Sequence, residues 1–204
     1  MIQKLYYDNP NPRDVNRVAD VLSNGGVVII PSDSLYAIAC SMQCRKAVER
    51  IAQLKGFTTK KARYSMICSS LSQASEYIRP LSKDVYQVLR EALPGPFTFI
   101  LDANGQVPRN YQNSNKTIGI RVPNDAICTA IIEALGCPLI ATSVRVQGED
   151  REKEYITDPE LIHEIFGNRV DLVVDAGIGD DEPSTVVDCS NGQMEIIRQG
   201  KGVL

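Results

Sequence analysis

The sequence predicts one α/β domain, residues 1–204, built around a twisted, open, mixed β-sheet flanked by helices. Two observations lead to this fold class. Short apolar runs typical of buried strands alternate along the whole chain with segments whose apolar residues recur at helical spacing. No Pro- or Ser-rich linker and no internal repeat interrupts this alternation. The 204 residues, 43% of them hydrophobic, are enough to bury one sizeable core, so we expect a single domain.

In the first half of the chain, residues 14–23 form a predicted amphipathic helix, and a pair of glycines ends it. The continuous apolar run at 27–31 is typical of a buried strand. A second predicted helix covers residues 46–56 and stops at a glycine, and residues 64–68 follow as a strand. The third predicted helix, residues 82–93, ends before a proline, which cannot continue a helix.

The second half repeats the alternation. Helices are predicted at residues 125–136, which end in a glycine, and at 158–167, which begin with an Asp cap and a proline in the first turn. Runs of β-branched and aromatic residues predict the remaining strands, namely 97–102, 117–122, 138–143, 170–177, 184–190 and 194–200.

Composition excludes several protein classes. Six cysteines could indicate a disulfide framework, but that pattern belongs to short secreted chains, and the first ten residues have no apolar signal core. We therefore expect reduced thiols and a cytoplasmic location. No Cys-x-x-Cys and no Cys/His ligand set occurs, so no structural metal is expected. No apolar run approaches the roughly 20 residues of a membrane-spanning helix, so no membrane partner is expected.

Positive charge is concentrated in one segment. Residues 44–63 carry seven lysines and arginines against one glutamate, whereas the whole chain has a net charge of −3. Such a segment predicts a local binding site for anions. A solvated helix face is an equally good interpretation of Arg45, Lys46 and Arg50, which can pair with Glu49. The stretch from Lys55 to Arg63 has no acidic residue and reads as a loop.

The sequence lacks the common catalytic signatures. There is no P-loop, no Gly-x-Gly-x-x-Gly after a strand and no His-Glu-x-x-His helix. The single histidine, His163, lies within a predicted helix, where a surface or core-edge role is expected, so a histidine-based triad is excluded.

Hydroxyl side chains lie at or just beyond the ends of four predicted strands. These positions face the crevice where open α/β sheets bind ligands. Each of them alone is better explained as a turn or strand-edge residue, but four sites together favour a polar cleft. The residues are Ser32, Ser34 and Tyr36, then Thr98, then Thr142 and Ser143, and finally Ser184 and Thr185.

Arg121 shares one face of its predicted strand with Thr117 and Gly119, while Ile118, Ile120 and Val122 point to the other face. A nearly buried arginine needs an anionic partner. Two interpretations remain open: a salt bridge to Asp33 or Asp188, or a ligand carboxylate or phosphate held by the guanidinium group. Arg198 raises the same question near the C-terminus.

These segments together resemble the YrdC/YciO family of threonylcarbamoyl-adenylate synthases, especially its YciO branch. The resemblance covers nearly the whole chain, from GGVVIIPSDSLYAIAC through ERIAQLKG, LPGPFTFIL, KTIGIRVP and PLIATS to PSTVVD and IIRQG. It implies a twisted open sheet with a concave basic face that binds nucleotide and double-stranded RNA or tRNA. In active members threonine, bicarbonate and ATP condense to threonylcarbamoyl-AMP and pyrophosphate for modification of a tRNA adenosine.

The resemblance also implies site residues. Lys55 matches the lysine of the family's Lys-x-Arg motif and Ser143 the serine of its Ser-x-Asn motif, and with Arg145 they are the candidate catalytic residues. Residues that match nucleotide- or substrate-binding positions are Ser32, Tyr36, Thr98, Arg121, Ser184 and Arg198. The basic loop assigns RNA binding to Lys60, Lys61 and Arg63. ATP is the implied ligand or substrate and L-threonine the implied co-substrate, with Mg²⁺ expected only as the ion accompanying the nucleotide.

Two positions depart from the family signature, because Phe57 stands where the family has Arg and Arg145 where it has Asn. Both touch the anion-binding part of the pocket. Three readings follow: a nucleotide- and RNA-binding protein with altered or absent synthase activity, a working synthase in which Arg145 compensates for Phe57, and an interaction module without a ligand. The basic loop disfavours the third, since its self-repulsion is costly unless an anion visits it.

Overall fold

The computed structural model describes residues 1–56, 64–113, 115–145, 155–190 and 192–204. Within this part of the chain it forms one α/β domain with a ten-stranded mixed sheet, which confirms the predicted fold class. The strands, in chain order, are β1 (Ile2–Lys4), β2 (Val27–Ile30), β3 (Ala37–Ser41), β4 (Ser65–Ile67), β5 (Phe97–Asp102), β6 (Thr117–Arg121), β7 (Leu139–Ser143), β8 (Leu172–Asp175), β9 (Thr185–Asp188) and β10 (Glu195–Arg198).

The helices of the described residues begin at well-formed caps in most cases. Side chains of Asn11, Ser70, Ser82, Asp125 and Asp158 accept hydrogen bonds from the first turns of their helices. The helices are α1 (Pro12–Ser23), α2 (Arg45–Leu54), α3 (Leu71–Ser75), α4 (Lys83–Ala92), α5 (Ala126–Leu135) and α6 (Pro159–Phe166), with a 3₁₀ turn at Arg109–Tyr111.

Strand order in the sheet is β1-β8-β2-β3-β7-β4-β6-β5-β9-β10. The pairs β1–β8, β8–β2, β4–β6 and β5–β9 are parallel, and the other neighbours are antiparallel. Strands far apart in the chain are therefore neighbours, and β7 lies between the half made of β1, β8, β2 and β3 and the half made of β4, β6, β5, β9 and β10.

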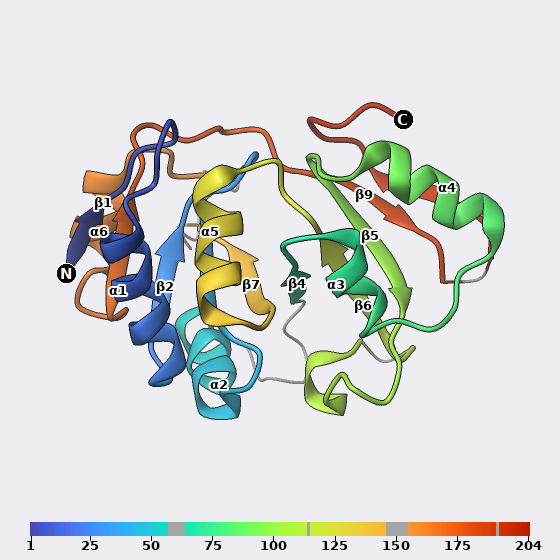
Figure 1. Cartoon of the computed structure of the whole chain (residues 1–204), viewed down its shortest axis with the longest axis horizontal. Coiled ribbons are helices and arrows are strands. Elements are labelled where there is room, and N and C mark those ends of the chain that lie inside the picture. The colour runs from blue at the N-terminus through green and yellow to red at the C-terminus, as the bar shows by residue number, and fades with distance from the viewer. Residues whose placement is uncertain (57–63, 114, 146–154, 191) are drawn as a thin grey trace.

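Each face of the sheet has its own core. Ile38, Ile140 and Met66 belong to a cluster with α2, α3, α4 and α6. Alternate residues such as Ala39 and Ala141 belong to a second cluster with α1 and α5. Figure 1 shows α1 and α5 side by side at one half of the sheet and α3 and α4 at the other half. Period-2 alternation along the strands therefore separates two apolar layers.

The face of the sheet covered by α1 and α5 is apolar at β7 but carries polar side chains from β4 onward. In the row that contains Ala141, the neighbouring strands contribute Ser65 and Gly119. Thr98 and Arg121 lie on the same polar face, and the methyl carbon of Thr98 is 3.0 Å from a Cβ built on Gly119. This polar half of the sheet positions the candidate site.

Four elements were not predicted from the sequence: β1, β3, α3 and the 3₁₀ turn. The missed β3 is the important one, because Ala37–Ser41 pairs with both β2 and β7. Its small residues have weak strand propensity, so the pairing decides its conformation. Other predicted elements are found with ends shifted by a few residues, as β8 shows at 172–175 against the expected 170–177.

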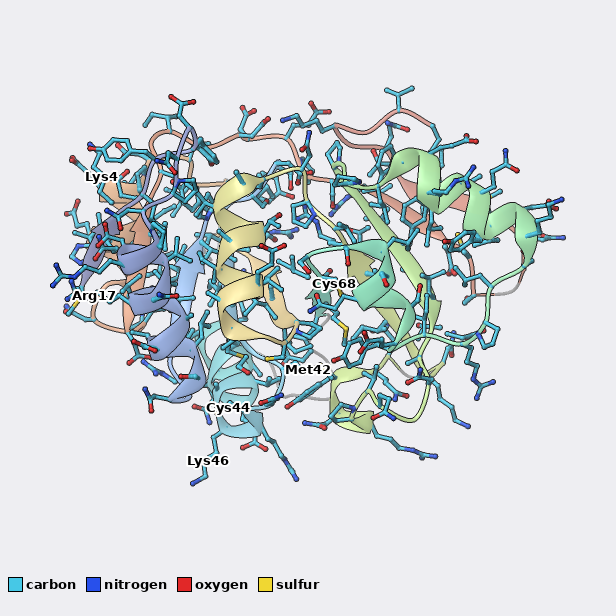
Figure 2. The ribbon with its side chains drawn as sticks, viewed as in Figure 1. Lys4, Arg17, Met42, Cys44, Lys46 and Cys68 are labelled. Atoms are coloured by element: carbon cyan, nitrogen blue, oxygen red, sulfur yellow. The ribbon has the colours of Figure 1, made fainter. Side chains whose placement is uncertain are left out.

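All six cysteines are free, as expected for reduced thiols. Figure 2 shows Cys68 inside the molecule and Lys46 extending away from α2. Within the described residues, no helix is long and apolar enough to cross a membrane. The same residues contain no group of three or more His, Cys, Asp or Glu side chains placed to hold a metal ion.

Candidate functional site

The loop after β2 folds onto the polar half of the sheet and is held by its own hydroxyls. Ser32 donates through Oγ to the carbonyl of Leu35 at 2.7 Å, and its Oγ lies 3.3 Å from that of Ser34. Both serines are buried. The loop conformation therefore follows from local Ser side-chain to backbone bonds, which are typical of such turns.

Tyr36 at the end of this loop is also buried, and its hydroxyl is engaged. It donates to the carbonyl of Gly177 at 2.8 Å and accepts from the amide of Ala176 at 3.2 Å. Burial raises the pKa of Tyr36 to about 12, so the phenol stays protonated. Tyr36 thus ties the loop after β2 to the loop after β8.

Arg121 at the end of β6 has a protein partner. Its Nη2 lies 2.7 Å from Oδ1 of Asp33 and donates to Oγ of Ser34 at 2.9 Å. Of the partners considered from the sequence, Asp33 forms the salt bridge, and Asp188 instead accepts bonds from Ser190. The buried Nε of Arg121 has no hydrogen-bond partner in the described part of the chain. An orphaned guanidinium N–H is costly in a buried place, and a ligand oxygen or water would satisfy it.

Thr98, Ser184 and Arg198 form a second group on the polar half of the sheet. The hydroxyl oxygens of Thr98 and Ser184 are 2.8 Å apart. Arg198 donates from Nη2 to the carbonyl of Ser184 at 2.6 Å. The parallel pairing of β5 with β9 sets Thr98 beside the start of β9, and β10 supplies the arginine. Residues 86 positions apart in the chain therefore meet on neighbouring strands near one edge of the sheet.

Lys55 and Arg145 meet at Ser143. Lys55, directly after α2, donates from Nζ to the carbonyl of Ser143 at 2.6 Å. Arg145 donates from Nε to Oγ of the same serine at 3.2 Å. The guanidinium of Arg145 also stacks over the ring of Tyr155 at 5.0 Å, and these two residues form an antiparallel β-bridge. The three candidate catalytic residues are thus in direct contact.

Electrostatics connect these groups into one site. Burial and then the charge of Arg145 lower the pKa of Lys55 to about 8. Burial lowers the pKa of Arg198, Tyr155 opposes that shift, and the charges of Arg145 and Arg121 add to it. The charge of Arg145 therefore reaches both Lys55 and Arg198, and that of Arg121 reaches Arg198. We call Lys55, Arg121, Arg145 and Arg198 the cationic cluster. Within the described residues, neither Arg145 nor Arg198 forms an ion pair with a carboxylate.

The basic segment at 44–63 divides into two parts. Arg45 pairs with Glu49 at 3.0 Å, and Arg50 pairs with Asp171 and donates to the carbonyl of Arg169. The solvated-face interpretation, with pairing to Glu49, therefore holds for Arg45, whereas Arg50 pairs with Asp171 from a distant part of the chain. The residues predicted to bind RNA, Lys60, Lys61 and Arg63, lie outside the described residues, as does Phe57.

Sequence reasoning missed Tyr155 and Ser65. Tyr155 follows a charged stretch and belongs to no predicted element, so only its bridge to Arg145 reveals it. Ser65 lies in a strand that the sequence predicts from its apolar residues. The alternation of Ser65 with the apolar Met66 was the signal that could have placed it on the polar face.

Comparisons with known proteins show which family the chain is similar to. The family model Sua5_yciO_yrdC, described as "Telomere recombination", matches residues 20–200. The YciO protein of Escherichia coli K12 is 33% identical over 199 residues, which are 97% of this chain and 94% of that protein. Threonylcarbamoyl-AMP synthase of Marinobacter nauticus is 30% identical over 171 residues, 83% of this chain and 87% of that protein.

Solved structures of similar proteins have the same fold. The crystal structure of E. coli YciO matches with a TM-score of 0.90 and 31% identity, covering 100% of this chain and 97% of that chain. The structure of P. abyssi Sua5 complexed with L-threonine matches with a TM-score of 0.88, covering 98% of this chain and 57% of that chain. At 21% identity the Sua5 likeness shows the fold alone.

Proposed function

This chain belongs to the Sua5/YciO/YrdC family, which is related to threonylcarbamoyl-AMP synthase, and from that premise we propose that it binds an adenine nucleotide through its cationic cluster. The observation that carries the proposal is that Lys55 and Arg145 both contact Ser143, on the same polar half of the sheet as Arg198 and the Arg121–Asp33 pair. Lys55 is buried and Arg145 and Arg198 are partly buried, so their positive charges repel one another, and a bound phosphate chain would be attracted to all of them. The unpartnered Nε of Arg121 supplies a further donor.

Calorimetric titration with ATP and AMP tests this proposal. The wild-type chain should bind both, and Arg198→Ala should weaken binding at least about tenfold, the usual effect of losing a charge-assisted hydrogen bond. Arg45→Ala is the matched control, because Arg45 is exposed and paired with Glu49 on α2. An equal loss in both variants, or no binding by the wild type, would contradict the nucleotide proposal.

We propose further that duplex RNA or tRNA binds the same protein through the basic loop. A-form RNA is recognised mainly by backbone and shape, so the binding should be strongly salt-dependent and weakly sequence-dependent. Replacing Lys60 and Lys61 by Ala should flatten the slope of log affinity against log salt by roughly one to two units. An unchanged slope in this double variant would place the RNA elsewhere.

On synthase activity we propose slow turnover. Phe57 replaces a guanidinium donor of the family signature, and loss of one transition-state donor commonly costs about 3–4 kcal/mol. Nucleotide contacts are shared between ground and transition states, so binding survives better than chemistry. Phe57→Arg combined with Arg145→Asn should raise threonine- and bicarbonate-dependent pyrophosphate release at least about tenfold, with little change in nucleotide affinity.

A working synthase is the second candidate, and the position of Arg145 favours it. Arg145 contacts Ser143 beside Lys55 and stacks on Tyr155, so its guanidinium can supply the positive charge that Phe57 lacks. If the wild type turns over at about 1 per second or faster and Arg145→Ala abolishes turnover, this second candidate is correct.

A further inference from the structure

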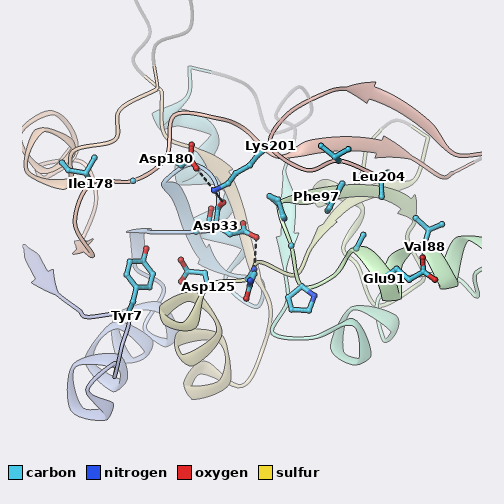
Figure 3. Close-up of a pocket in the computed structure, with 18 residues that line it drawn as sticks. Tyr7, Asp33, Val88, Glu91, Phe97, Asp125, Ile178, Asp180, Lys201 and Leu204 are labelled. Atoms are coloured by element: carbon cyan, nitrogen blue, oxygen red, sulfur yellow. Dashed lines mark hydrogen bonds and ion pairs between the residues drawn. The ribbon is translucent and has the colours of Figure 1, made fainter.

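Lys201 joins distant parts of the ten-stranded sheet. It follows β10 and donates from Nζ to Oδ2 of Asp180, in the loop after β8, at 2.5 Å and to the carbonyl of Asp33, in the loop after β2, at 2.9 Å (Figure 3). Six strands, β3, β7, β4, β6, β5 and β9, separate β2 from β10 in the sheet. One side chain therefore bridges loops that the strand order places far apart, beside a pocket of about 780 Å³ that all three residues line.

The backbone around Lys201 is held on both sides. The amide of Lys201 donates to the carbonyl of Pro183 at 2.9 Å. The buried hydroxyl of Thr185 accepts from the amide of Gly200 at 3.0 Å and donates to the carbonyl of Gly202 at 2.6 Å. A Cβ on Gly200 would lie 2.1 Å from the carbonyl oxygen of Pro183, so this close approach requires glycine. The side chain of Lys201 therefore starts from a fixed position.

Asp33, at the other end of the bridge, is the residue that holds Arg121. Its Oδ1 pairs with Arg121 at 2.7 Å, and its Oδ2 accepts from the amide of Asn124 at 2.8 Å. The side chains of Asp33 and Arg121 are only 8% and 10% exposed, so their neighbours set their positions. The bond from Lys201 to the carbonyl of Asp33 therefore fixes the backbone from which the carboxylate reaches Arg121.

Arg198 lies on the same segment as Lys201 and donates from Nη2 to the carbonyl of Ser184 at 2.6 Å. Lys201 therefore joins the segment that carries Arg198 to the loop that holds Arg121, and both arginines belong to the cationic cluster. A phosphate that bonds to two guanidinium groups needs them at a fixed separation. The hydrogen bond from Lys201 lowers the pKa of Asp180, so the two form an ion pair at neutral pH and the charge of Lys201 is balanced within the bridge.

We propose that Lys201 is a positioning residue of the nucleotide site: its bridge to Asp33 and Asp180 sets the separation of Arg121 and Arg198, and with it the fit of the cationic cluster to a phosphate. Lys201 acts through this geometry and not through its own charge on the ligand. The effect on affinity rests on the proposed nucleotide binding, whereas the effect on the loop after β2 does not.

Amide hydrogen exchange of the ligand-free full chain, followed by NMR, tests the bridge itself. Lys201→Met should speed exchange of the Asn124 amide at least about tenfold, because release of the Asp33 carbonyl loosens the carboxylate that accepts from this amide. Lys201→Arg can donate to the same two oxygens and should restore slow exchange. Lys83→Met, the same charge change at an exposed position in the first turn of α4, is the control and should have no effect. Unchanged exchange of the Asn124 amide in Lys201→Met would overturn the proposal.

Calorimetric titration with AMP separates positioning from a direct effect of charge. Lys201→Met and Asp180→Asn should each weaken AMP binding by about three- to tenfold, and the double variant should bind no more weakly than Lys201→Met alone, because both changes break one bridge. If Lys201 acted through its charge, Asp180→Asn would strengthen binding, since it removes a negative charge. Stronger binding by Asp180→Asn, or losses that add in the double variant, would overturn the proposal. If the wild type binds no AMP, the nucleotide proposal fails, and exchange at Asn124 still decides whether Lys201 positions Asp33.

Discussion

At the scale of single residues, the site depends on buried charges whose properties are set by their neighbours. Lys55 illustrates this, because burial and Arg145 together lower its pKa from 10.5 to about 8. Desolvation penalises the charged form, and a nearby guanidinium adds repulsion. Lys55 therefore loses its positive charge within a pH range where an ordinary lysine keeps it.

Nucleotide affinity should accordingly fall as the pH rises from 7 to 9.5. A phosphate favours protonated Lys55, so affinity is greatest below pH 8 and declines above it, whereas a lysine of pKa 10.5 would give no change in this range. Calorimetry with AMP across this range measures the effect. Lys55→Met should bind more weakly at pH 7 and show no decline, and a persisting decline would assign the titration to another group.

The lowered pKa of Lys55 also affects the free energy of unfolding. The sign of the effect is opposite to that of a lysine paired with a carboxylate, whose pKa is usually raised. Its folded-state pKa lies below its unfolded value, so the unfolded chain binds more protons between pH 8 and 10.5. The contribution of this group to the free energy of unfolding is unfavourable below pH 8, and the penalty disappears as the pH rises to 10.5. Urea unfolding of the wild type and of Lys55→Met at pH 7 and 9.5 measures this penalty as the difference between their free energies of unfolding. The difference should be smaller at pH 9.5. If it does not become smaller, Lys55 is not the group with the lowered pKa.

At the scale of elements, β6 shows how one strand serves both core and site. Its predicted alternation is confirmed, because Ile118 and Ile120 join the apolar cluster while Gly119 and Arg121 face the polar half of the sheet. Gly119 is a close-approach position. A Cβ there would lie 3.0 Å from the methyl carbon of Thr98 and 3.2 Å from Oγ of Ser65.

Gly119→Ala should therefore displace Thr98 and disturb its contact with Ser184. We expect a loss of about 1–3 kcal/mol in the free energy of unfolding, as for overpacking in a tight place, together with weaker nucleotide binding. Gly105→Ala is the control, because nothing lies within 4 Å of its Cβ position, and it should be neutral or slightly stabilising. Equal unfolding midpoints for the two variants in urea would show that the strand accommodates the methyl group.

At the scale of the whole molecule, stability depends on β7, which pairs with β3 on one side and β4 on the other. Ile140 of this strand has no exposed surface and belongs to the larger core cluster, while Ala141 belongs to the other one. Both cores therefore meet at a strand that joins distant parts of the chain.

Ile140→Ala should lower the free energy of unfolding by about 2–5 kcal/mol, since it removes buried methyl groups and leaves a cavity. Ile197→Ala is the matched control, because Ile197 is 49% exposed on the edge strand β10, and it should change stability by less than about 0.5 kcal/mol. Urea denaturation followed by circular dichroism compares them. A small effect of Ile140→Ala would mean that the two halves of the sheet hold together without the packing at β7.

The sequence by itself determined the fold class, most helices and strands, the two faces of β6 and the hydroxyls at the ends of strands, because these features depend on local periodicity and propensity. Only the tertiary structure decided that Ala37–Ser41 is a strand, since its neighbours β2 and β7 supply the pairing. It also decided that Asp33 holds Arg121, that Lys55 and Arg145 meet at Ser143, and that Lys201 links Asp33 to Asp180. The physical reason is that charge partners, burial and pKa depend on distances between segments far apart in the chain, 88 residues for both the Lys55–Ser143 and the Arg121–Asp33 contact, and strand order sets these distances.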